Sequence, residues 1–442
     1  MRGCFKVSYM KNKQISLYTL GCKVNQYESE AFAEALEADG YTAVQGGRDS
    51  AVCIINTCTV TGESDRKCRQ TIRHAIADNP GAYVIVTGCF AQISPEAIAS
   101  IEGVDCIIGN RNKLQVLEMA KKALNGNRIK VTNVESLQGA FYEEMQVKRS
   151  ERTRAYIKIQ DGCENNCSYC IIPKARGPIR SRKVKDVLLE AKNLVASGYK
   201  ELVLTGIEVA AYGKDLEDTN LLTLLTELDK LEGLSRIRLS SIELSFLRPH
   251  IIEGIAKLPK VCHHFHLSLQ SGCSRTLAAM KRKYNADMIR KSVAALRSAM
   301  PDILFSADII VGFPTETDGD FSETYALLSE LELLHMHVFS YSRRPGTPAA
   351  EIKNVSTGEQ IKARSKALLQ LDEESRQKVH CRMAPIGSKH KVLFETNENG
   401  MWTGHTENFM EITLSSTLDL HNRIENVEII GYLGKKLLGK LV

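Results

Sequence analysis

The sequence predicts an α/β protein with three consecutive parts: a doubly wound parallel sheet, a partial (β/α)6 barrel and a small antiparallel β-barrel. Three observations predict this order. Short apolar strands alternate with helical patterns over roughly the first 125 residues, and the same alternation resumes over six strands from about residue 155. Five short strands with turn residues between them then follow from about residue 387. Strand–helix alternation is typical of parallel sheets that are covered by helices.

The first part, residues 13–126, is predicted to be doubly wound because strand and helix patterns alternate along it. The predicted strands are 15–20, 52–56, 83–87 and 106–108. The predicted helices are 24–39, 64–77 and a short one that begins at Pro95. The alternation stops in a polar segment, so residues 127–150 are expected to be a linker.

The second part, residues 151–380, repeats the strand–helix unit six times and predicts a partial barrel. Its expected strands are 155–160, 201–205, 236–241, 264–270, 304–311 and 335–341, and a charged helix over 357–379 comes next. Such barrels carry their chemistry at the C-terminal ends of the strands. The third part, residues 381–442, has expected strands 389–395, 401–405, 409–414, 423–430 and 437–442, which suit a small antiparallel barrel.

Composition limits the class of protein. The chain has 442 residues, 43% of them hydrophobic and 25% charged, which allows two or three domains with ample cores. We find no run of about 18 apolar residues, so we expect no membrane span. The N-terminus is basic but lacks the apolar stretch of a signal peptide. Thirteen cysteines without a secretion signal favour metal-bound thiolates in a reducing cytoplasm over disulfides.

The most informative motif is Cys163-x-x-x-Cys167-x-x-Cys170, in the loop after the first predicted barrel strand. Three thiolates can hold three irons of a four-iron cluster and leave the fourth iron open for a substrate. A zinc knot and incidental cysteines are the alternatives. Zinc sites prefer four ligands in CxxC pairs, and no fourth Cys or His lies within this loop.

A second set of cysteines occupies matching places in the first part. Cys22, Cys58 and Cys89 each follow one of the first three predicted strands. The carboxyl ends of parallel strands converge on one crevice, so these thiols should meet there. Helix N-termini follow them and favour thiolates. Gly21 and Gly88 would let the backbone turn sharply before two of them.

Chance placement of buried cysteines is the alternative for this set. Cys53, Cys68 and Cys106 show that other cysteines occur in the same part of the chain. They are expected within a strand, on a helix and at a strand start, so none lies at a strand's C-terminal exit. This contrast favours a site formed by Cys22, Cys58 and Cys89.

Seven segments together resemble the methylthiotransferase family of radical S-adenosylmethionine (SAM) enzymes. They are TLGCKVNQYES, NTCTVT, VTGCFAQ, DGCENNCSYCIIPKARGPIRSR, SLQSGCSRTLAAMKRKY, DIIVGFPTET and YSRRPGTPA. The resemblance covers nearly the whole chain, from about residue 15 to 442. It implies an N-terminal α/β domain, a (β/α)6 SAM domain and a C-terminal TRAM barrel that binds RNA.

The resemblance also implies the cofactors: two 4Fe–4S clusters and SAM. Cys163, Cys167 and Cys170 would hold the radical SAM cluster, and Cys22, Cys58 and Cys89 the auxiliary cluster, so both sets would be catalytic. One SAM would methylate a sulfur carried on the auxiliary cluster. A second would be cleaved to a 5′-deoxyadenosyl radical that removes the C2 hydrogen of an adenine in tRNA.

Several further residues would contact SAM. Thr205, Gly206 and Glu208 stand where the superfamily has a Gly-Gly-Glu segment near the methionine amino group, although the first Gly is Thr here. Asp308 resembles the strand-five position near the adenine. Tyr169 would stack or pack beside the cluster.

Period-2 alternation predicts which side chains line the barrel. Ser268 and Gln270 should face the lumen with His264 and His266, while Phe265, Leu267 and Leu269 pack on the outer helices. Ser306 and Asp308 share a face of the fifth strand, as do Arg238 and Ser240 on the third. A polar lumen suits a polar cosubstrate, with a histidine metal site as the alternative.

The first two motifs most resemble the branch that acts on N6-threonylcarbamoyladenosine (t6A) at position 37 of tRNA. The alternatives are the N6-isopentenyladenosine branch, the branch that modifies a ribosomal-protein aspartate, an iron–sulfur electron carrier, and a non-catalytic zinc- or cluster-stabilised RNA-binding protein. The expected partners are the tRNA anticodon loop at A37 and an electron donor such as flavodoxin or ferredoxin. The sulfur donor is not identified, and we expect a monomer.

Basic residues beside the cysteine loop also suggest an RNA partner. Between Arg149 and Lys183 there are nine Lys or Arg against three Asp or Glu. Arg176, Arg180, Arg182 and Lys183 would offer a cationic face to RNA. We expect Cys4, Cys262, Cys273 and Cys381 to have no functional role.

Overall fold

The structure is a computed structural model that describes residues 13–149 and 152–442. Cys4 and the predicted domain boundary at residues 150–151 lie outside the described residues. The chain divides into two compact units. The first contains the residues up to Val147 together with 162–164 and 171–180, and the second contains the remaining segments from Lys148 to Val442.

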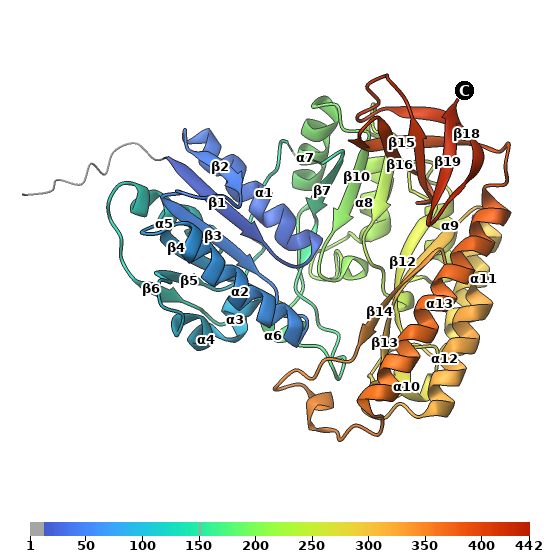
Figure 1. Ribbon diagram of the computed structural model, residues 1–442, viewed down its shortest axis with the longest axis horizontal. Helices are drawn as coiled ribbons and strands as arrows, with labels where there is room; N and C mark the ends of the chain where they lie inside the picture. The colour runs from blue at the N-terminus through green and yellow to red at the C-terminus, as the bar shows by residue number, and fades with distance from the viewer. Residues whose placement is uncertain (1–12, 150–151) are drawn as a thin grey trace, which may run out of the picture. The chain divides into compact units, whose positions relative to one another are not determined.

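The first unit contains a parallel sheet with strand order β2-β1-β3-β4-β5-β6 within residues 13–149 (Figure 1). Its strands are β1 (Gln14–Thr19), β2 (Thr42–Gln45), β3 (Val52–Thr57), β4 (Tyr83–Gly88), β5 (Cys106–Ile108) and β6 (Val131–Asn133). The four predicted strands are confirmed, and β2 was not predicted. β6 lies in the segment predicted as linker, so that prediction was wrong for these three residues. The strand order reverses between β1 and β3, where ligands bind in doubly wound sheets.

Helices cover both faces of this sheet. The first-unit helices are α1 (Lys23–Ala38), α2 (Gly62–Asp78), α3 (Cys89–Ile93), α4 (Pro95–Ala99), α5 (Gln115–Leu124) and α6 (Ile172–Arg176). Alternate residues of β3 and β4, among them Ile55 and Val84, pack with Ile72 of α2 and Phe90 of α3 in one buried cluster. α1 and α5 pack against each other. The alternation of strand faces thus yields two helical layers.

In the described part of the second unit, six parallel strands form two three-stranded sheets, β11-β10-β7 and β12-β13-β14. Isolated bridges join Ile237 to Val261 and Ile242 to Leu267. The predicted alternation of six parallel strands with helices is confirmed. Its strands are β7 (Arg154–Lys158), β10 (Glu201–Thr205), β11 (Arg236–Leu239), β12 (His264–Gln270), β13 (Leu304–Val311) and β14 (His335–Ser340), with β8 (Gln160–Asp161) and β9 (Arg180–Ser181) as a separate ribbon.

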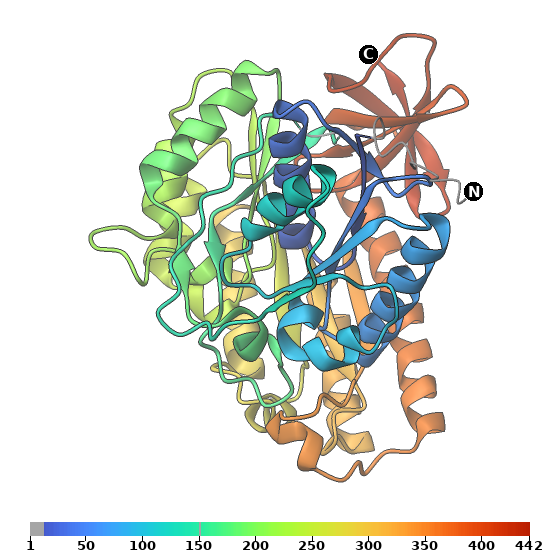
Figure 2. The same ribbon diagram turned by 90° about the vertical axis from the view of Figure 1, so that its left-hand side faces the viewer.

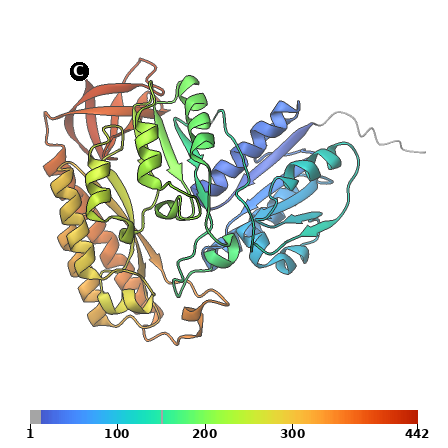
Figure 3. The ribbon, with the colours of Figure 1, turned by 180° about the vertical axis from the view of Figure 1, so that it is seen from behind.

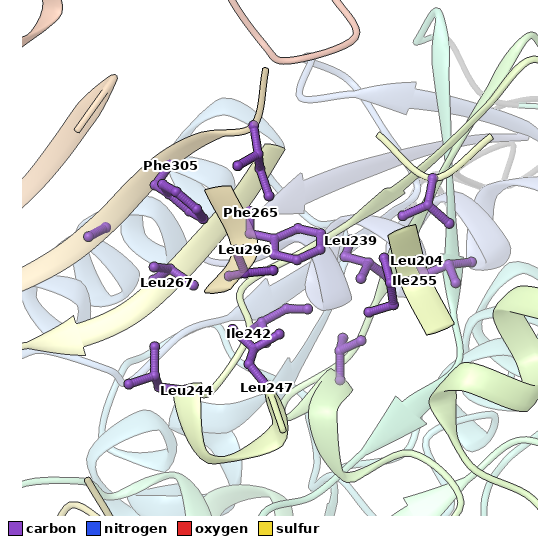
Figure 4. Close-up of a cluster of buried hydrophobic side chains, with 14 of the residues drawn as sticks. Leu204, Leu239, Ile242, Leu244, Leu247, Ile255, Phe265, Leu267, Leu296 and Phe305 are labelled. Carbon is purple, nitrogen blue, oxygen red and sulfur yellow. The ribbon is translucent and has the colours of Figure 1, made fainter. Parts of the chain in front are cut away.

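The barrel helices pack on the strands from outside. They are α7 (Val184–Ala196), α8 (Leu221–Asp229), α9 (Pro249–Ala256), α10 (Ser274–Ala279), α11 (Ala286–Ala299), α12 (Asp318–Leu331) and α13 (Gly358–Met383), with 3-10 turns η1 (Val209–Ala211), η2 (Leu244–Phe246) and η3 (Pro348–Glu351). Figure 3 shows α11, α12 and α13 side by side. Phe265 and Leu267 of β12 meet Phe305 and Leu296 in the outer core (Figure 4). The predicted outward face of β12 is therefore confirmed.

The last five strands form a closed barrel in the order β15-β16-β17-β19-β18, visible in red in Figure 2. They are β15 (Lys389–Glu398), β16 (Met401–Thr406), β17 (Glu411–Ser415), β18 (Ile424–Leu433) and β19 (Lys436–Leu441). Four neighbouring pairs are antiparallel, and β17 with β19 is parallel. Five predicted strands are confirmed, and the parallel pair was not predicted. Among the helices of residues 13–149 and 152–442, none could span a membrane.

Candidate active site

The three N-terminal cysteines lie where the sequence predicts, at the carboxyl ends of neighbouring strands. Cys22 caps α1 after β1, Cys58 follows β3, and Cys89 begins α3 directly after β4. β1 and β3 are adjacent in the sheet, as are β3 and β4. The thiols therefore gather at the switch point of the strand order, at the position where this fold binds ligands.

Two glycines permit the close approach of these loops. Gly21 has φ +106° and Gly88 has φ +97°, a region that favours glycine. A Cβ on Gly21 would lie 2.7 Å from Cβ of Cys58, and a Cβ on Gly88 would lie 2.6 Å from the backbone nitrogen of Thr57. The sharp turns expected at both glycines are confirmed.

The thiols of this set influence one another. Burial and, to a smaller extent, the neighbouring thiols of Cys89 and Cys22 raise the pKa of Cys58 to about 11. Cys22 also interacts electrostatically with Cys89. Metal binding to such thiols must release protons, because the thiolate is the ligand. A cluster that supplies positive iron at this point would fit the donor set.

Within residues 13–149 and 152–442, no three His, Cys, Asp or Glu side chains lie close enough to share one metal ion. A four-iron cluster imposes a different requirement, since each thiolate binds its own iron. Three thiols that are set apart from one another can each bind a different iron of such a cluster.

A buried ion network borders the N-terminal thiols, and the sequence did not predict it. Arg176 donates from Nε to the Cys89 sulfur over 3.1 Å and from Nη1 to Glu28 over 2.6 Å. Its Nη2 donates to Oδ1 of Asn25 over 2.6 Å. Lys113 pairs with the same Glu28. The spacing of Cys22, Asn25 and Glu28, three residues apart on one helix, is the signal that could have revealed this network.

The structure corrects the predicted RNA-binding face beside the cysteine loop. Arg176 and Arg182 have no exposed surface and Arg180 has 6%. Arg182 pairs with Glu190, and Arg180 donates to the backbone oxygen of Arg176. Only Lys183 of these four residues is exposed. The three arginines are internal ion-pairing and hydrogen-bonding groups and present no cationic surface.

Local and long-range hydrogen bonds hold the loop that contains Cys163, Cys167 and Cys170. The amide of Cys163 donates to Gly177, and the amide of Cys170 donates to Cys167. Arg282 donates from Nη1 to the Cys167 sulfur over 3.3 Å. The three thiols are partly exposed. The loop therefore presents them from one short stretch of chain.

Tyr169 packs where the sequence predicts an aromatic side chain. It lies against a small buried cluster that contains Met280 and Phe313. Burial raises its pKa well above the ordinary value, and the neighbouring Cys167 raises it further. The phenol is therefore neutral and acts as a packing group.

The segment predicted to contact the SAM amino group begins at Thr205, the last residue of β10. Thr205 is buried, and a Cβ on Gly206 would lie 2.9 Å from Oε1 of Gln160. The Glu208 amide donates to the same Oε1 over 2.8 Å, and Asn165 donates to the Glu208 carboxylate over 2.9 Å. Burial, followed by the nearby Glu243, raises the pKa of Glu208 to about 7.

A cavity of about 270 Å³ adjoins this segment. Its lining includes Asn165, Glu208, Glu243 and Lys283. Lys283 also donates to Asn165 over 2.8 Å. Carboxylate and ammonium groups thus meet in one concave site, which suits a ligand with both charges.

The polar face of β12 and β13 brings His266 and Asp308 together. Nε2 of His266 lies 3.0 Å from Oδ1 of Asp308. The Ser268 carbonyl accepts from Arg282 over 3.0 Å. Gln270 has φ +66° at a register shift in the strand pairing, so its backbone leaves the regular strand there. Such a strained residue at a strand end is common at functional sites.

The polar face of β11 differs from the expected open lumen. Arg238 is buried and bonded to Glu201 over 2.6 Å. Phe409, from the turn between β16 and β17, lies 4.8 Å from the Arg238 guanidinium and stacks on His264 at 4.7 Å. This end of the barrel is therefore filled by the protein's own side chains.

Comparisons with known proteins identify the family of this chain. Residues 157–328 match the Radical SAM superfamily, and residues 14–109 match the uncharacterized protein family UPF0004. The threonylcarbamoyladenosine tRNA methylthiotransferase MtaB of Bacillus subtilis is 39% identical, with 94% of this chain and 93% of the relative covered. The protein of the same name from Thermotoga maritima is 38% identical, with 90% and 91% covered. The chain belongs to the radical SAM methylthiotransferase family.

Family membership confirms the resemblance and makes this chain a radical SAM enzyme. The predicted SAM and iron–sulfur chemistry is confirmed at that level. A tRNA-2-methylthio-N(6)-dimethylallyladenosine synthase from Acetivibrio thermocellus is 32% identical, with 95% of this chain and 89% of the relative covered. The solved structure of the radical SAM methyltransferase TsrM from Kitasatospora setae has a TM-score of 0.58 at 17% identity, with 77% of each chain covered, and supports the fold alone.

Proposed function

We propose that this methylthiotransferase converts t6A at position 37 of tRNA to its 2-methylthio derivative. The similarity at 36–39% identity to four relatives with this printed activity carries the proposal. The dimethylallyladenosine synthases among the relatives are 32% identical, so methylthiolation of isopentenyladenosine is the second candidate.

We assign one 4Fe–4S cluster to Cys163, Cys167 and Cys170 and a second to Cys22, Cys58 and Cys89. With SAM bound, the clusters would supply radical formation at the first site and sulfur delivery at the second. The chain's own part is to hold six thiolates in two sets and to keep a guanidinium beside each set. Arg282 and Arg176 each donate to one of these sulfurs.

The second unit offers groups for a zwitterionic cosubstrate. We propose that ionised Glu208 accepts from the methionine ammonium of SAM and that the backbone at Thr205 and Gly206 contacts the same end. Gln270 and Ser268 would orient the ribose, and Asp308, fixed by His266, would lie toward the adenine. Tyr169 would pack beside the cluster loop.

We further propose that the C-terminal barrel is a TRAM domain that contacts tRNA near the anticodon loop. Its closed five-strand form and its place after α13 support this assignment. Four points remain predictions. They are the domain boundaries 13–126, 151–380 and 381–442, a monomeric state, a cytoplasmic location, and flavodoxin or ferredoxin as the electron donor.

The deciding experiment is mass analysis of tRNA nucleosides from cells that lack and then regain this chain. Gain of the methylthio group on t6A supports the proposal, whereas gain on isopentenyladenosine supports the second candidate. Anaerobic reconstitution should yield about eight irons and, on reduction with SAM, 5′-deoxyadenosine. Colourless protein with stoichiometric zinc would contradict both candidates.

A further inference from the structure

We infer that Arg176 is a positioning residue that sets the reduction potential of the N-terminal cluster through a direct hydrogen bond to Cys89. The inference rests on the proposed assignment of Cys22, Cys58 and Cys89 as cluster ligands. The Nε–H of Arg176 points at the Cys89 sulfur from 3.1 Å. Hydrogen bonds to cluster sulfurs and nearby charge are two of the factors that determine such potentials.

The Arg176 side chain is fixed in this position by partners on three sides. Glu28 and Asn25 each accept a hydrogen bond from the guanidinium over 2.6 Å, and the Cys89 sulfur accepts a third from Nε over 3.1 Å. Asn110 donates to the carbonyl of Ala175 over 2.7 Å and so anchors the preceding backbone. Because the guanidinium is planar and its N–H groups have fixed directions, one N–H can point at a sulfur. A lysine ammonium holds such a direction less well.

Charge in this network favours an anionic neighbour. Glu28 lies between two cations, Arg176 and Lys113, and all three side chains are at most 2% exposed. The formal charges of this trio sum to +1. A cluster ligated by three thiolates would place negative charge beside these buried cations, which lowers the cost of holding them in an apolar interior. The network therefore suits an adjacent anion.

The electronic consequence follows from Coulomb's law. One-electron reduction adds one negative charge to a cluster, and a nearby guanidinium stabilises the reduced form more than the oxidised form. Arg176 should therefore raise the reduction potential of the N-terminal cluster. It does so through its charge and its hydrogen bond, and its guanidinium stays protonated throughout. Removing Glu28 should raise the potential further, because its negative charge opposes the same effect.

The test uses full-length chain in which Cys163, Cys167 and Cys170 are changed to Ala, so that only the N-terminal cluster assembles. After iron content is measured, the midpoint potential is titrated anaerobically with a chemical reductant in this parent and in three derivatives: Arg176→Gln, Arg176→Lys and Glu28→Gln. Arg182→Gln is the matched control, since it removes another fully buried, carboxylate-paired arginine, one that pairs with Glu190 in the second unit.

We expect Arg176→Gln to lower the midpoint by about 59 mV, a tenfold change in the one-electron equilibrium. Arg176→Lys should lie between that variant and the parent, because charge remains but the aimed N–H is lost. Glu28→Gln should shift the midpoint upward, and Arg182→Gln should leave it unchanged. Equal midpoints in the parent and the Arg176 and Glu28 variants would overturn the inference. A parent that assembles no cluster would instead overturn the proposed assignment of these cysteines and, with it, the inference.

Discussion

The two cysteine sets solve a similar chemical problem with different structures. Cys22, Cys58 and Cys89 are spread along the chain and meet because a parallel sheet aligns three strand ends. The loop set is contained between residues 163 and 170. Each set has an arginine that donates to one sulfur: Arg176 to Cys89 and Arg282 to Cys167. The dispersed set thus depends on the N-terminal sheet, whereas the loop set lies on one short segment that distant residues also hold, as in the hydrogen bond from the Ser168 amide to the Met280 carbonyl.

The largest expected effect separates the functions of the two sets. Cys167→Ala should reduce 5′-deoxyadenosine formation to the background rate, because it removes a ligand from the loop. Cys58→Ala should retain measurable SAM cleavage but give no methylthiolated nucleoside. The measurement is chromatography of 5′-deoxyadenosine and nucleosides from the same anaerobic reaction. Identical behaviour of the two well-folded variants would contradict the division of labour.

The contrast between the two sets also explains what the sequence could predict. The loop set is visible from spacing alone, and the strand pattern was sufficient to place Cys22, Cys58 and Cys89 at converging strand ends. Arg176 was predicted as a surface cation because a basic run is usually solvated. Its burial arises from Glu28 and Asn25, more than a hundred residues earlier in the chain. Such long-range pairing leaves little trace in local composition.

β2 and β6 were missed for a related reason. Both are edge strands of the N-terminal sheet, at opposite ends of the strand order. β2 has four residues and β6 has three, and none of them is buried. An edge strand of this length lacks the apolar run that reveals a central strand such as β3, in which all six residues are buried.

A second prediction tests whether the dispersed set depends on its fold. Gly88→Ala should destabilise the first unit by about 3 kcal/mol, because φ is positive and the new Cβ would meet the Thr57 backbone. Iron content should fall from about eight to about four per chain, since the loop set remains. Thermal unfolding and iron analysis measure both effects.

Gly126→Ala is the matched control for that prediction. Gly126 also has positive φ, at +87°, but a Cβ there meets nothing within 4 Å. It should cost about 1 kcal/mol and leave both clusters in place. If both substitutions lowered stability equally, the close approach at Gly88 would have no special importance for the N-terminal thiols.

A third prediction concerns pH and the second unit. The pKa of Glu208 is about 7, so its ionised fraction rises about tenfold from pH 6 to pH 8. If the carboxylate binds the SAM ammonium, SAM affinity should rise by a similar factor over this range. Isothermal titration calorimetry measures it, and Glu208→Gln should bind weakly with little pH dependence.

The same residue gives a stability test without SAM. The folded-state pKa of Glu208 lies above its ordinary value of 4.5, so the folded state holds the proton more tightly. Stability from this group is present below about pH 4.5 and is lost as pH rises through about 7. Glu208→Gln should therefore be more stable than the wild type at pH 8 in the absence of SAM. A lower melting temperature for the variant at pH 8 would contradict the raised pKa.

The smallest expected effect concerns a cysteine that is not a proposed ligand. The Cys68 sulfur accepts from the Cys58 amide over 3.4 Å and donates to the Cys58 carbonyl over 3.2 Å, so it supports the backbone of a proposed ligand. Cys68→Ala should cost about 1 kcal/mol through these lost contacts while iron content stays at the wild-type value. Cys106→Ala, at a buried cysteine of β5 in the same unit, serves as the control and should also retain iron. If Cys68→Ala lost the N-terminal cluster and Cys106→Ala kept it, the dispersed set would need a fourth sulfur to hold its three ligands in place. The two sets would then differ in the number of cysteines that each requires.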